Sequence, residues 1–219
     1  MSRILKVAAA QLGPIALDEP RSSAVGRMIV LLQNAKAQGA ELVIFPELAL
    51  TTFFPRWYTE DQSEIDKYFE TEMPNKDTEP LFAEARKLKI GFNFGFAELV
   101  VEKRVTRHFN TAIIVDQQGR IAAKYRKIHL PGHTENEPWR AFQHLEKRYF
   151  EKGNLGFQVH QVFGGKIGMC ICNDRRWPET FRVMGLQGVE LVALGYNTPA
   201  HYPLAPEHDH LQEFHNHLV

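Results

Sequence analysis

The chain has 219 residues, of which 44% are hydrophobic and 24% charged, a composition typical of a soluble globular protein with one sizeable core. Lysine plus arginine equals aspartate plus glutamate at 26 each, and no long basic run occurs, which argues against nucleic acid or a membrane surface as the main partner. No segment is long enough to span a bilayer, and the N-terminus lacks the order of a signal peptide, so we expect a cytoplasmic location.

Strands and helices alternate along the first half of the chain. The apolar runs 7–12 and 42–45, the second closed by Pro46, predict short buried strands. Residues 22–37 predict a helix that stops at Gly39. Its apolar residues recur at helical spacing, namely Val25, Met28, Ile29, Leu32 and Ala35. The aromatic-rich segment 91–97 predicts a further strand.

The second half of the chain shows paired strands. Residues 111–115 and 121–125 flank a polar turn and predict a hairpin, and 159–163 with 166–172 predict another around Gly164 and Gly165. Residues 191–194 predict one more strand, whereas 127–156 show no clear period. The pattern predicts one α/β domain over 1–219, with a mixed sheet covered by helices, and no linker or repeat.

Three reactive side chains each follow an apolar strand, where sites assemble in α/β folds. They are Glu47, Lys127 and Cys172. A thiol attacks carbon well only as thiolate, so it needs a base or a nearby cation. Glu47 can act as the base, and Lys127 can lower the thiol pKa and stabilise an oxyanion. Together they predict acyl transfer from nitrogen to water.

Each of these residues also has an ordinary explanation when it is taken alone. A glutamate before a leucine is usually a surface carboxylate, and a lysine in a basic loop is usually solvated. A cysteine at a strand end is more often a small core residue than a nucleophile.

The stretches around the three residues resemble the glutamate, lysine and cysteine signatures of the nitrilase superfamily, in the same order. They are Phe45-Pro46-Glu47-Leu48, Lys124 to Leu130 and Gly168 to Glu179. Longer strings are similar, more finely, to N-carbamoyl-D-amino acid amidohydrolases, the D-carbamoylases. They are Phe45 to Trp57, Lys127 to His133, His144 to Phe150, Cys172 to Glu179 and Gly195 to Pro199. The resemblance covers the whole chain.

The resemblance implies a four-layer αββα sandwich that assembles into dimers or tetramers and uses no cofactor and no metal. It implies that Glu47 is the base, Lys127 the oxyanion-stabilising cation and Cys172 the nucleophile. Glu146 matches a second glutamate that supports the lysine, although a surface charge beside Lys147 explains it equally well.

A carbamoyl amino acid carries a carboxylate, which guanidinium groups recognise best. Arg175 and Arg176 follow the nucleophile closely enough to hold that carboxylate, although either could instead pair with Asp174 or Glu179. Five further residues are candidates for hydrogen bonds to the substrate: His129, His144, Asn173, Asn197 and Thr198. A turn role for the polar residues and a structural role for the histidines remain the alternatives.

Cys170 and Cys172 would lie on one face of a strand with Cα atoms roughly 6.5–7 Å apart, which is poor disulfide geometry. A redox-sensing pair is a weaker alternative function. The tail contains His201, His208, His210, His215 and His217. Their density suggests metal, but their spacing also fits one helix with a mixed face.

The last residues, Leu218 and Val219, fall within a predicted helix, whereas the resembled family continues for several more strands and helices. We therefore expect a C-terminally truncated chain, unstable and weakly active alone. The predicted substrates are small molecules, N-carbamoyl-D-amino acids. The predicted reaction is their hydrolysis to the amino acid, ammonia and carbon dioxide. The alternatives are another amidase of the superfamily, such as a β-ureidopropionase or an aliphatic amidase, and an inactive remnant that binds a partner subunit.

Overall fold

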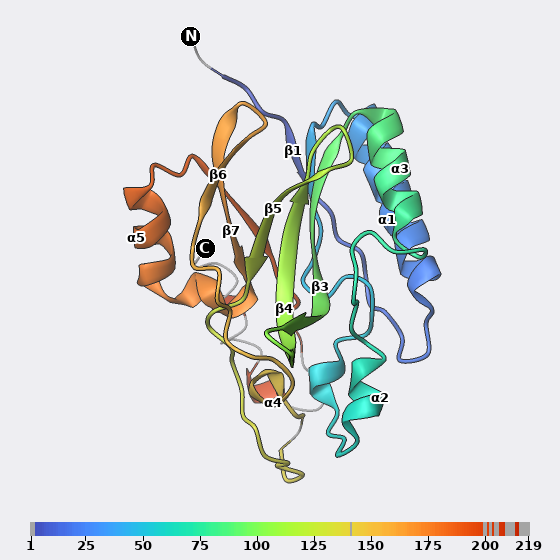
Figure 1. The fold of residues 1–219 in the computed structure, drawn as a ribbon, viewed down its shortest axis with the longest axis vertical. Helices are drawn as coiled ribbons and strands as arrows, with labels where there is room; N and C mark the ends of the chain where they lie inside the picture. The colour runs from blue at the N-terminus through green and yellow to red at the C-terminus, as the bar shows by residue number, and fades with distance from the viewer. Residues whose placement is uncertain are drawn as a thin grey trace.

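In the computed structural model, which describes residues 3–140, 142–198, 201, 203, 206–208, 213 and 214, two β-sheets pack face to face between outer helices (Figure 1). In this part of the chain the first sheet has the order β1-β2-β3-β4-β5 and the second the order β6-β7-β8. The strands are β1 (Val7–Ala9), β2 (Leu42–Ile44), β3 (Gly91–Glu102), β4 (Val105–Val115), β5 (Ile121–Arg126), β6 (Val159–Val162), β7 (Gly165–Ile171) and β8 (Leu191–Gly195).

The helices lie on both outer faces and at one end of the molecule. They are α1 (Arg21–Ala37), α2 (Gln62–Asp66), α3 (Glu79–Leu88), α4 (Glu146–Tyr149) and α5 (Pro178–Leu186), with 3-10 turns η1 (Phe54–Arg56), η2 (Cys172–Arg176) and η3 (Pro206–His208). In Figure 1, α1 and α3 flank the first sheet and α5 flanks the second. The layers follow the order helix, sheet, sheet, helix, in agreement with the αββα arrangement that the resemblance implied. None of the helices in the described ranges has the length and hydropathy needed to cross a bilayer.

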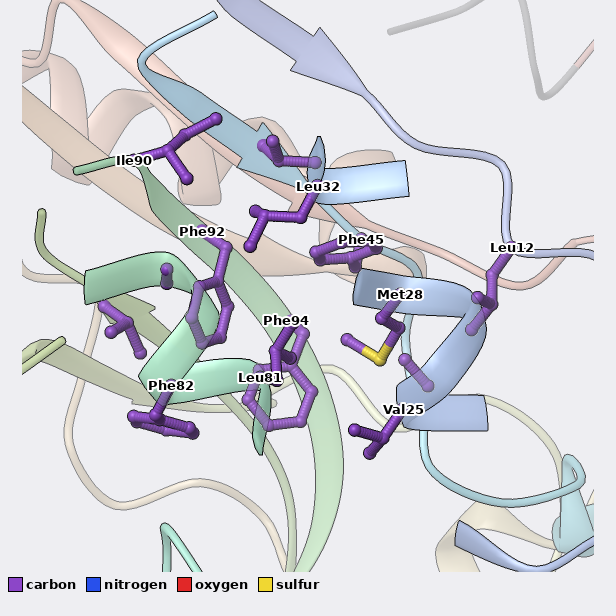
Figure 2. Close-up of a cluster of buried hydrophobic side chains, with 14 of the residues drawn as sticks. Leu12, Val25, Met28, Leu32, Phe45, Leu81, Phe82, Ile90, Phe92 and Phe94 are labelled. Carbon is purple, nitrogen blue, oxygen red and sulfur yellow. The ribbon is translucent and has the colours of Figure 1, made fainter. Parts of the chain in front are cut away.

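The outer core lies between the first sheet and helices α1 and α3. Figure 2 shows Val25 and Met28 of α1 and Phe82 of α3 beside Phe92 and Phe94 of β3. The helical spacing predicted for residues 22–37 is confirmed, because α1 buries Ala24, Val25, Met28, Leu32 and Ala35 on one side. No helix was predicted over 79–88, although Leu81, Phe82 and Ala85 of α3 are buried at helical spacing.

The second core fills the space between the two sheets. Leu42, Ile114 and Tyr125 of the first sheet belong to one buried cluster with Ile167 and Met169 of β7. This packing corrects the prediction of a single mixed sheet: the chain forms two, each with parallel and antiparallel pairs. The alternation of apolar and polar residues cannot distinguish one sheet from two, because in both cases each strand buries one of its faces.

Both predicted hairpins are confirmed. Strands β4 and β5 are antiparallel with Thr111 opposite Arg126, and β6 and β7 are antiparallel with Val162 opposite Gly165. The second turn is shifted by one residue from the prediction, since its two central residues are Phe163 and Gly164. Both have positive φ, 53° and 72°, as a type I′ turn requires.

The prediction of a buried strand over 7–12 is wrong in its length and its burial. Strand β1 covers Val7–Ala9, and its residues are exposed or half-buried. It lies at the edge of the first sheet, paired only with β2 among the described strands. An edge position leaves side chains open to solvent even when their composition is apolar.

Candidate active site

The three predicted reactive residues follow β2, β5 and β7 and are buried together. Glu47 is separated from β2 by Phe45 and Pro46, and Lys127 follows β5 directly. Their side chains are 0% exposed, and the whole Cys172 residue, which opens η2, is 7% exposed. Charged groups rarely become fully buried unless they are paired, so the arrangement of these side chains needs explanation.

The explanation is an ammonium group held between two carboxylates. Lys127 Nζ donates to Glu47 Oε1 and to Glu146 Oε2, each at 2.6 Å. Glu146 is the first residue of α4 and is fully buried, so the surface-charge interpretation of this residue is wrong. Leu145, Tyr149 and other apolar residues around α4 form a buried cluster that fixes its position.

The pKa values of the two carboxylates are shifted in opposite directions. Burial raises the pKa of Glu47, and the attraction of Lys127 does not fully offset this. Burial would also raise the pKa of Glu146, but Lys127 and a hydrogen bond with His144 lower it below its ordinary value. The pKa of Lys127 is raised, because the carboxylates outweigh the opposing effect of burial. The lysine therefore stays charged, and Glu47 is the better proton acceptor.

Cys172 has a positive φ of 45°, a left-handed conformation that is uncommon for a residue with a side chain. Burial, with the negative charge of Glu47, raises the pKa of its thiol to about 11. Lys127 lowers it, as predicted, but is outweighed. The thiol is therefore protonated at neutral pH, and a base must take its proton as it attacks. Glu47 Oε2 is buried without a hydrogen-bond partner among the described residues, and it is available for that proton.

Asp174 holds the turn that carries Cys172. Its carboxylate accepts hydrogen bonds from Tyr125 Oη at 2.7 Å, from the Ile171 amide at 3.0 Å and from the amide of His129 at 2.9 Å. The His129 ring also bonds to it through Nδ1 at 2.9 Å. The turn that carries Cys172 and the segment after Lys127 are thus joined by one buried carboxylate, which the sequence analysis had considered only as a partner for an arginine.

The two predicted carboxylate-binding arginines have different surroundings. Arg175 is buried, and its Nη1 donates to the Cys172 carbonyl at 2.8 Å and lies 3.8 Å from the Cys172 sulfur. Its guanidinium also lies over the ring of Tyr196, 4.8 Å from the centroid. Arg176 is exposed, and its Nη1 donates to Asn173 Oδ1 at 3.4 Å. Arg175 is therefore the arginine that adjoins the nucleophile.

The remaining predicted binding residues surround this centre. His144 Nε2 lies 3.2 Å from Glu146 Oε1, and the His129 ring stacks on Trp177. Asn173 Nδ2 donates to the carbonyl of His129 at 3.0 Å. These contacts give both histidines structural partners, and their roles toward a substrate stay predictions.

A cleft of about 730 Å³ lies beside the centre, large enough for a small molecule. It is lined by residues after β1 and β2 and by the end of β8, including Glu47, Asn197 and Thr198. Thr198 Oγ1 lies 3.7 Å from the Cys172 sulfur. Thr198 therefore lies between the cleft and Cys172.

Asn110 is a site residue that the sequence analysis missed. It lies on β4, and its side-chain amide donates to Glu47 Oε1 at 2.8 Å and to Glu146 Oε2 at 3.3 Å. A polar residue inside the apolar strand 109–115 was the available signal, since a fully buried amide needs partners.

The two cysteines are free, as the predicted geometry required, and Cys170 is buried within β7. Of the histidine tail, residues 210, 215 and 217 lie outside the described residues. Within the described ranges, no group of three or more histidine, cysteine or acidic side chains is arranged to hold a metal ion.

The comparisons with known proteins agree with this arrangement. The family model of carbon-nitrogen hydrolases matches residues 6–218. The chain is 32% identical to an N-carbamoylputrescine amidase of Arabidopsis thaliana over 74% of this chain and 49% of that protein. It is 31% identical to a nitrilase of Pyrococcus abyssi over 87% of this chain and 64% of that protein, and 27% identical to a citrullinase of Francisella tularensis over 95% and 67%.

The solved structures show the same fold. A carbon-nitrogen hydrolase from Helicobacter pylori superposes with a TM-score of 0.71 at 23% identity, over 98% of this chain and 66% of that one. An amidase from Nesterenkonia sp. AN1 superposes with a TM-score of 0.68 at 20% identity, over 87% and 67%. The predicted nitrilase-superfamily fold is confirmed. The chain spans between half and two thirds of the length of these relatives, and it belongs to the carbon-nitrogen hydrolase family of the nitrilase superfamily.

Proposed function

We propose that this chain carries the active site of an amidohydrolase that cleaves the ureido C–N bond of N-carbamoyl-D-amino acids. The products are the D-amino acid, ammonia and carbon dioxide. The observation that carries the proposal is the buried set of Glu47, Lys127 and Cys172, with Arg175 beside the sulfur. The similarity to N-carbamoylputrescine amidases supports an N-carbamoyl compound as substrate. The preference for the D configuration rests on the resemblance of the longer sequence strings.

The first half of the reaction forms a thioester. The Cys172 sulfur attacks the ureido carbon while its proton passes to Glu47 Oε2. An ammonium group has three N–H donors, and Lys127 uses two of them on Glu47 and Glu146, so the third can stabilise the oxyanion. The tetrahedral intermediate collapses, the bond to the terminal nitrogen breaks, and Glu47 returns the proton to that nitrogen as ammonia leaves.

The second half of the reaction consumes water. Glu47 takes a proton from a water molecule, whose oxygen attacks the thioester carbon, and the C–S bond breaks with the proton returning to sulfur. The released N-carboxy amino acid loses carbon dioxide and leaves the free amine. The thiol and Glu47 finish in their starting protonation states, so one water molecule is consumed in each turnover.

Arg175 supplies the specificity for an α-carboxylate in this proposal. Its Nη1 lies 3.8 Å from the Cys172 sulfur, and carboxylates pair well with a guanidinium group. Arg176, Asn173, Asn197, Thr198, His129 and His144 are proposed to contact the substrate around it.

The test is ammonia release by the purified chain from four compounds, with Cys172→Ala as the control. The compounds are an N-carbamoyl-D-amino acid, its L enantiomer, N-carbamoylputrescine and a simple aliphatic amide. Release that is fastest from the D compound and absent in the variant supports the proposal. Faster release from the amide or from N-carbamoylputrescine would assign the chain to another amidase class. We propose that the protein assembles as a homodimer or homotetramer, to be checked by its mass in solution.

A further inference from the structure

Asn110 is placed by strand register, because it lies directly opposite Lys127. Thr111 of β4 pairs with Arg126 of β5, so the next pair along the two strands is Asn110 and Lys127. The Lys127 amide donates to the Asn110 carbonyl at 2.8 Å, which continues the hydrogen-bonded ladder past the end of β5. Strand pairing therefore fixes the backbone from which the side chain of Asn110 extends.

The side chain of Asn110 completes a closed cycle of four hydrogen bonds between two donor nitrogens and two acceptor oxygens. Lys127 Nζ and Asn110 Nδ2 each donate to the same two oxygens, Glu47 Oε1 and Glu146 Oε2. Asn110 thus offers both carboxylates a second donor without adding charge. A second cation at this place would hold Glu47 more firmly ionised and weaken it as a base.

The side-chain amide of Asn110 donates to both carboxylates, but its own oxygen has no hydrogen-bond partner among the described residues. Asn110 Oδ1 is buried and accepts no hydrogen bond from the described residues, although a buried polar atom without a partner is destabilising. A buried polar atom without a hydrogen bond calls for an explanation, and such destabilising features persist mainly at functional sites. Here the orientation that leaves Oδ1 unpaired is the one that directs both amide hydrogens toward the two carboxylates.

From this geometry we propose that Asn110 is a positioning residue of the reaction: it holds Glu47 through Oε1, so that Oε2 is left as the proton acceptor for Cys172. The inference rests on the proposed function of Glu47 as the base. The charged and titratable groups that face Glu47 are Lys127 after β5, Glu146 on α4 and Cys172 on η2. Behind them, His144 contacts Glu146 and Arg175 contacts Cys172.

The direction of the expected effect follows from these groups. The hydrogen bond from Asn110 favours the ionised form of Glu47 and opposes the raising of its pKa by burial. Removing the donor should raise that pKa further. A lost hydrogen bond to a charged group corresponds to a shift of about one to two pH units. The acid limb of any reaction that needs ionised Glu47 should move up by that amount.

The experiment uses iodoacetamide, which reacts with the Cys172 thiol and needs no substrate. The alkylation rate is followed from pH 4 to 10 for the purified chain, for Asn110→Leu and for Thr111→Val, with Cys172→Ala giving the background from Cys170. Thr111 is the matched control: it is the next residue of β4, is equally buried, and donates to the buried carboxylate of Glu98 at 2.8 Å.

An acid limb that moves to higher pH in Asn110→Leu, but not in Thr111→Val, supports the proposal. An acid limb at the wild-type pH in Asn110→Leu overturns the proposal. So does an alkylation rate that is reduced by the same factor at every pH in both Asn110→Leu and Thr111→Val. Asn110→Ala is measured alongside, so that a folding failure of the leucine variant does not decide the result. Because ammonia release is not needed, a wrong substrate assignment would leave this test intact.

Discussion

Lys127 Nζ lies 2.6 Å from Glu47 Oε1, and neither side chain has any exposed surface. The same nitrogen lies 2.6 Å from Glu146 Oε2, so one cation serves two carboxylates. The three groups carry a net charge of −1 when all are ionised, and the fold favours the negative charge on Glu146, whose pKa is lowered, over that on Glu47, whose pKa is raised.

This asymmetry predicts opposite effects of two like substitutions on stability. A group with a raised folded pKa destabilises the fold once it ionises, so Glu47→Gln should leave the melting temperature unchanged or raise it at pH 7. The stability that ionised Glu146 supplies is present above its unfolded pKa and lost as pH falls through its lowered folded value. Glu146→Gln should therefore cost about 1–3 kcal/mol at pH 7. Thermal melts of both variants check this, and equal losses would contradict it.

The pH dependence of thiol reactivity provides a second prediction. With a thiol pKa of about 11, free thiolate forms only at high pH, so alkylation at neutral pH depends on Glu47 accepting the proton. The wild-type rate should show a low plateau above the Glu47 pKa and a second rise toward pH 11. Glu47→Gln should remove the plateau and keep the rise, which stopped-flow or mass-spectrometric alkylation rates can measure. A plateau that persists in the variant would exclude Glu47 as the acceptor.

Arg175 should act on binding and depend on the substrate. Arg175→Lys keeps the charge but loses the planar fork, so KM for a carbamoyl amino acid should rise about tenfold or more. N-carbamoylputrescine lacks the α-carboxylate, and its KM should change little. Steady-state ammonia release with both compounds gives the comparison. Arg176→Lys, at an exposed position, is the matched variant and should have the smaller effect if Arg175 holds the carboxylate.

Cys170 should be dispensable for hydrolysis. It is buried in β7 opposite Leu194, and burial raises the pKa of its thiol well above the ordinary range. Such a cysteine behaves as a small apolar residue. Cys170→Ala should keep the turnover rate and the response to oxidant of the wild-type chain, measured by ammonia release before and after peroxide. A lost oxidative response in this variant would revive the redox-pair hypothesis.

Phe92 should dominate the stability of the outer core. Its ring is fully buried and lies within 6.4 Å, centroid to centroid, of Phe45, Phe82 and Phe94. Phe92→Ala should cost about 3–5 kcal/mol in unfolding free energy because it leaves a cavity. Val101→Ala, at a site 65% exposed on the same strand, should cost less than about 0.5 kcal/mol. Urea denaturation of both variants tests the contrast.

The sequence predicted the elements whose signals are local. Helix α1 follows from the spacing of Val25, Met28 and Leu32. The two hairpins follow from a polar turn and from a glycine turn between apolar runs. Helix α5 was missed because its periodic signal is weak: it begins at Pro178, and Phe181 and Leu186 are exposed in the structure. The exposure of β1 was missed because position within a sheet is not a property of the strand's own residues.

The site residues likewise fall into those with a local signal in the sequence and those whose role depends on distant residues. Glu47, Lys127 and Cys172 were predicted because each follows an apolar run and because the family signatures match there. Asn110 was missed because its role depends on the register of β4 against β5, which places Lys127 opposite it. Asp174 was misjudged because its partner Tyr125 lies 49 positions away in the chain. Register and long-range contact are set by tertiary packing, and no short window of sequence contains them.

The four hydrogen bonds on the carboxylate of Asp174 have a consequence for how the site opens. They fasten the strained turn of Cys172 and the segment beginning at His129 to one buried group. Opening either segment breaks the anchor of the other, so the two should loosen as a single cooperative unit. Displacement of Cys172 from its position should therefore coincide with loosening of the segment that begins at His129, and neither should occur alone.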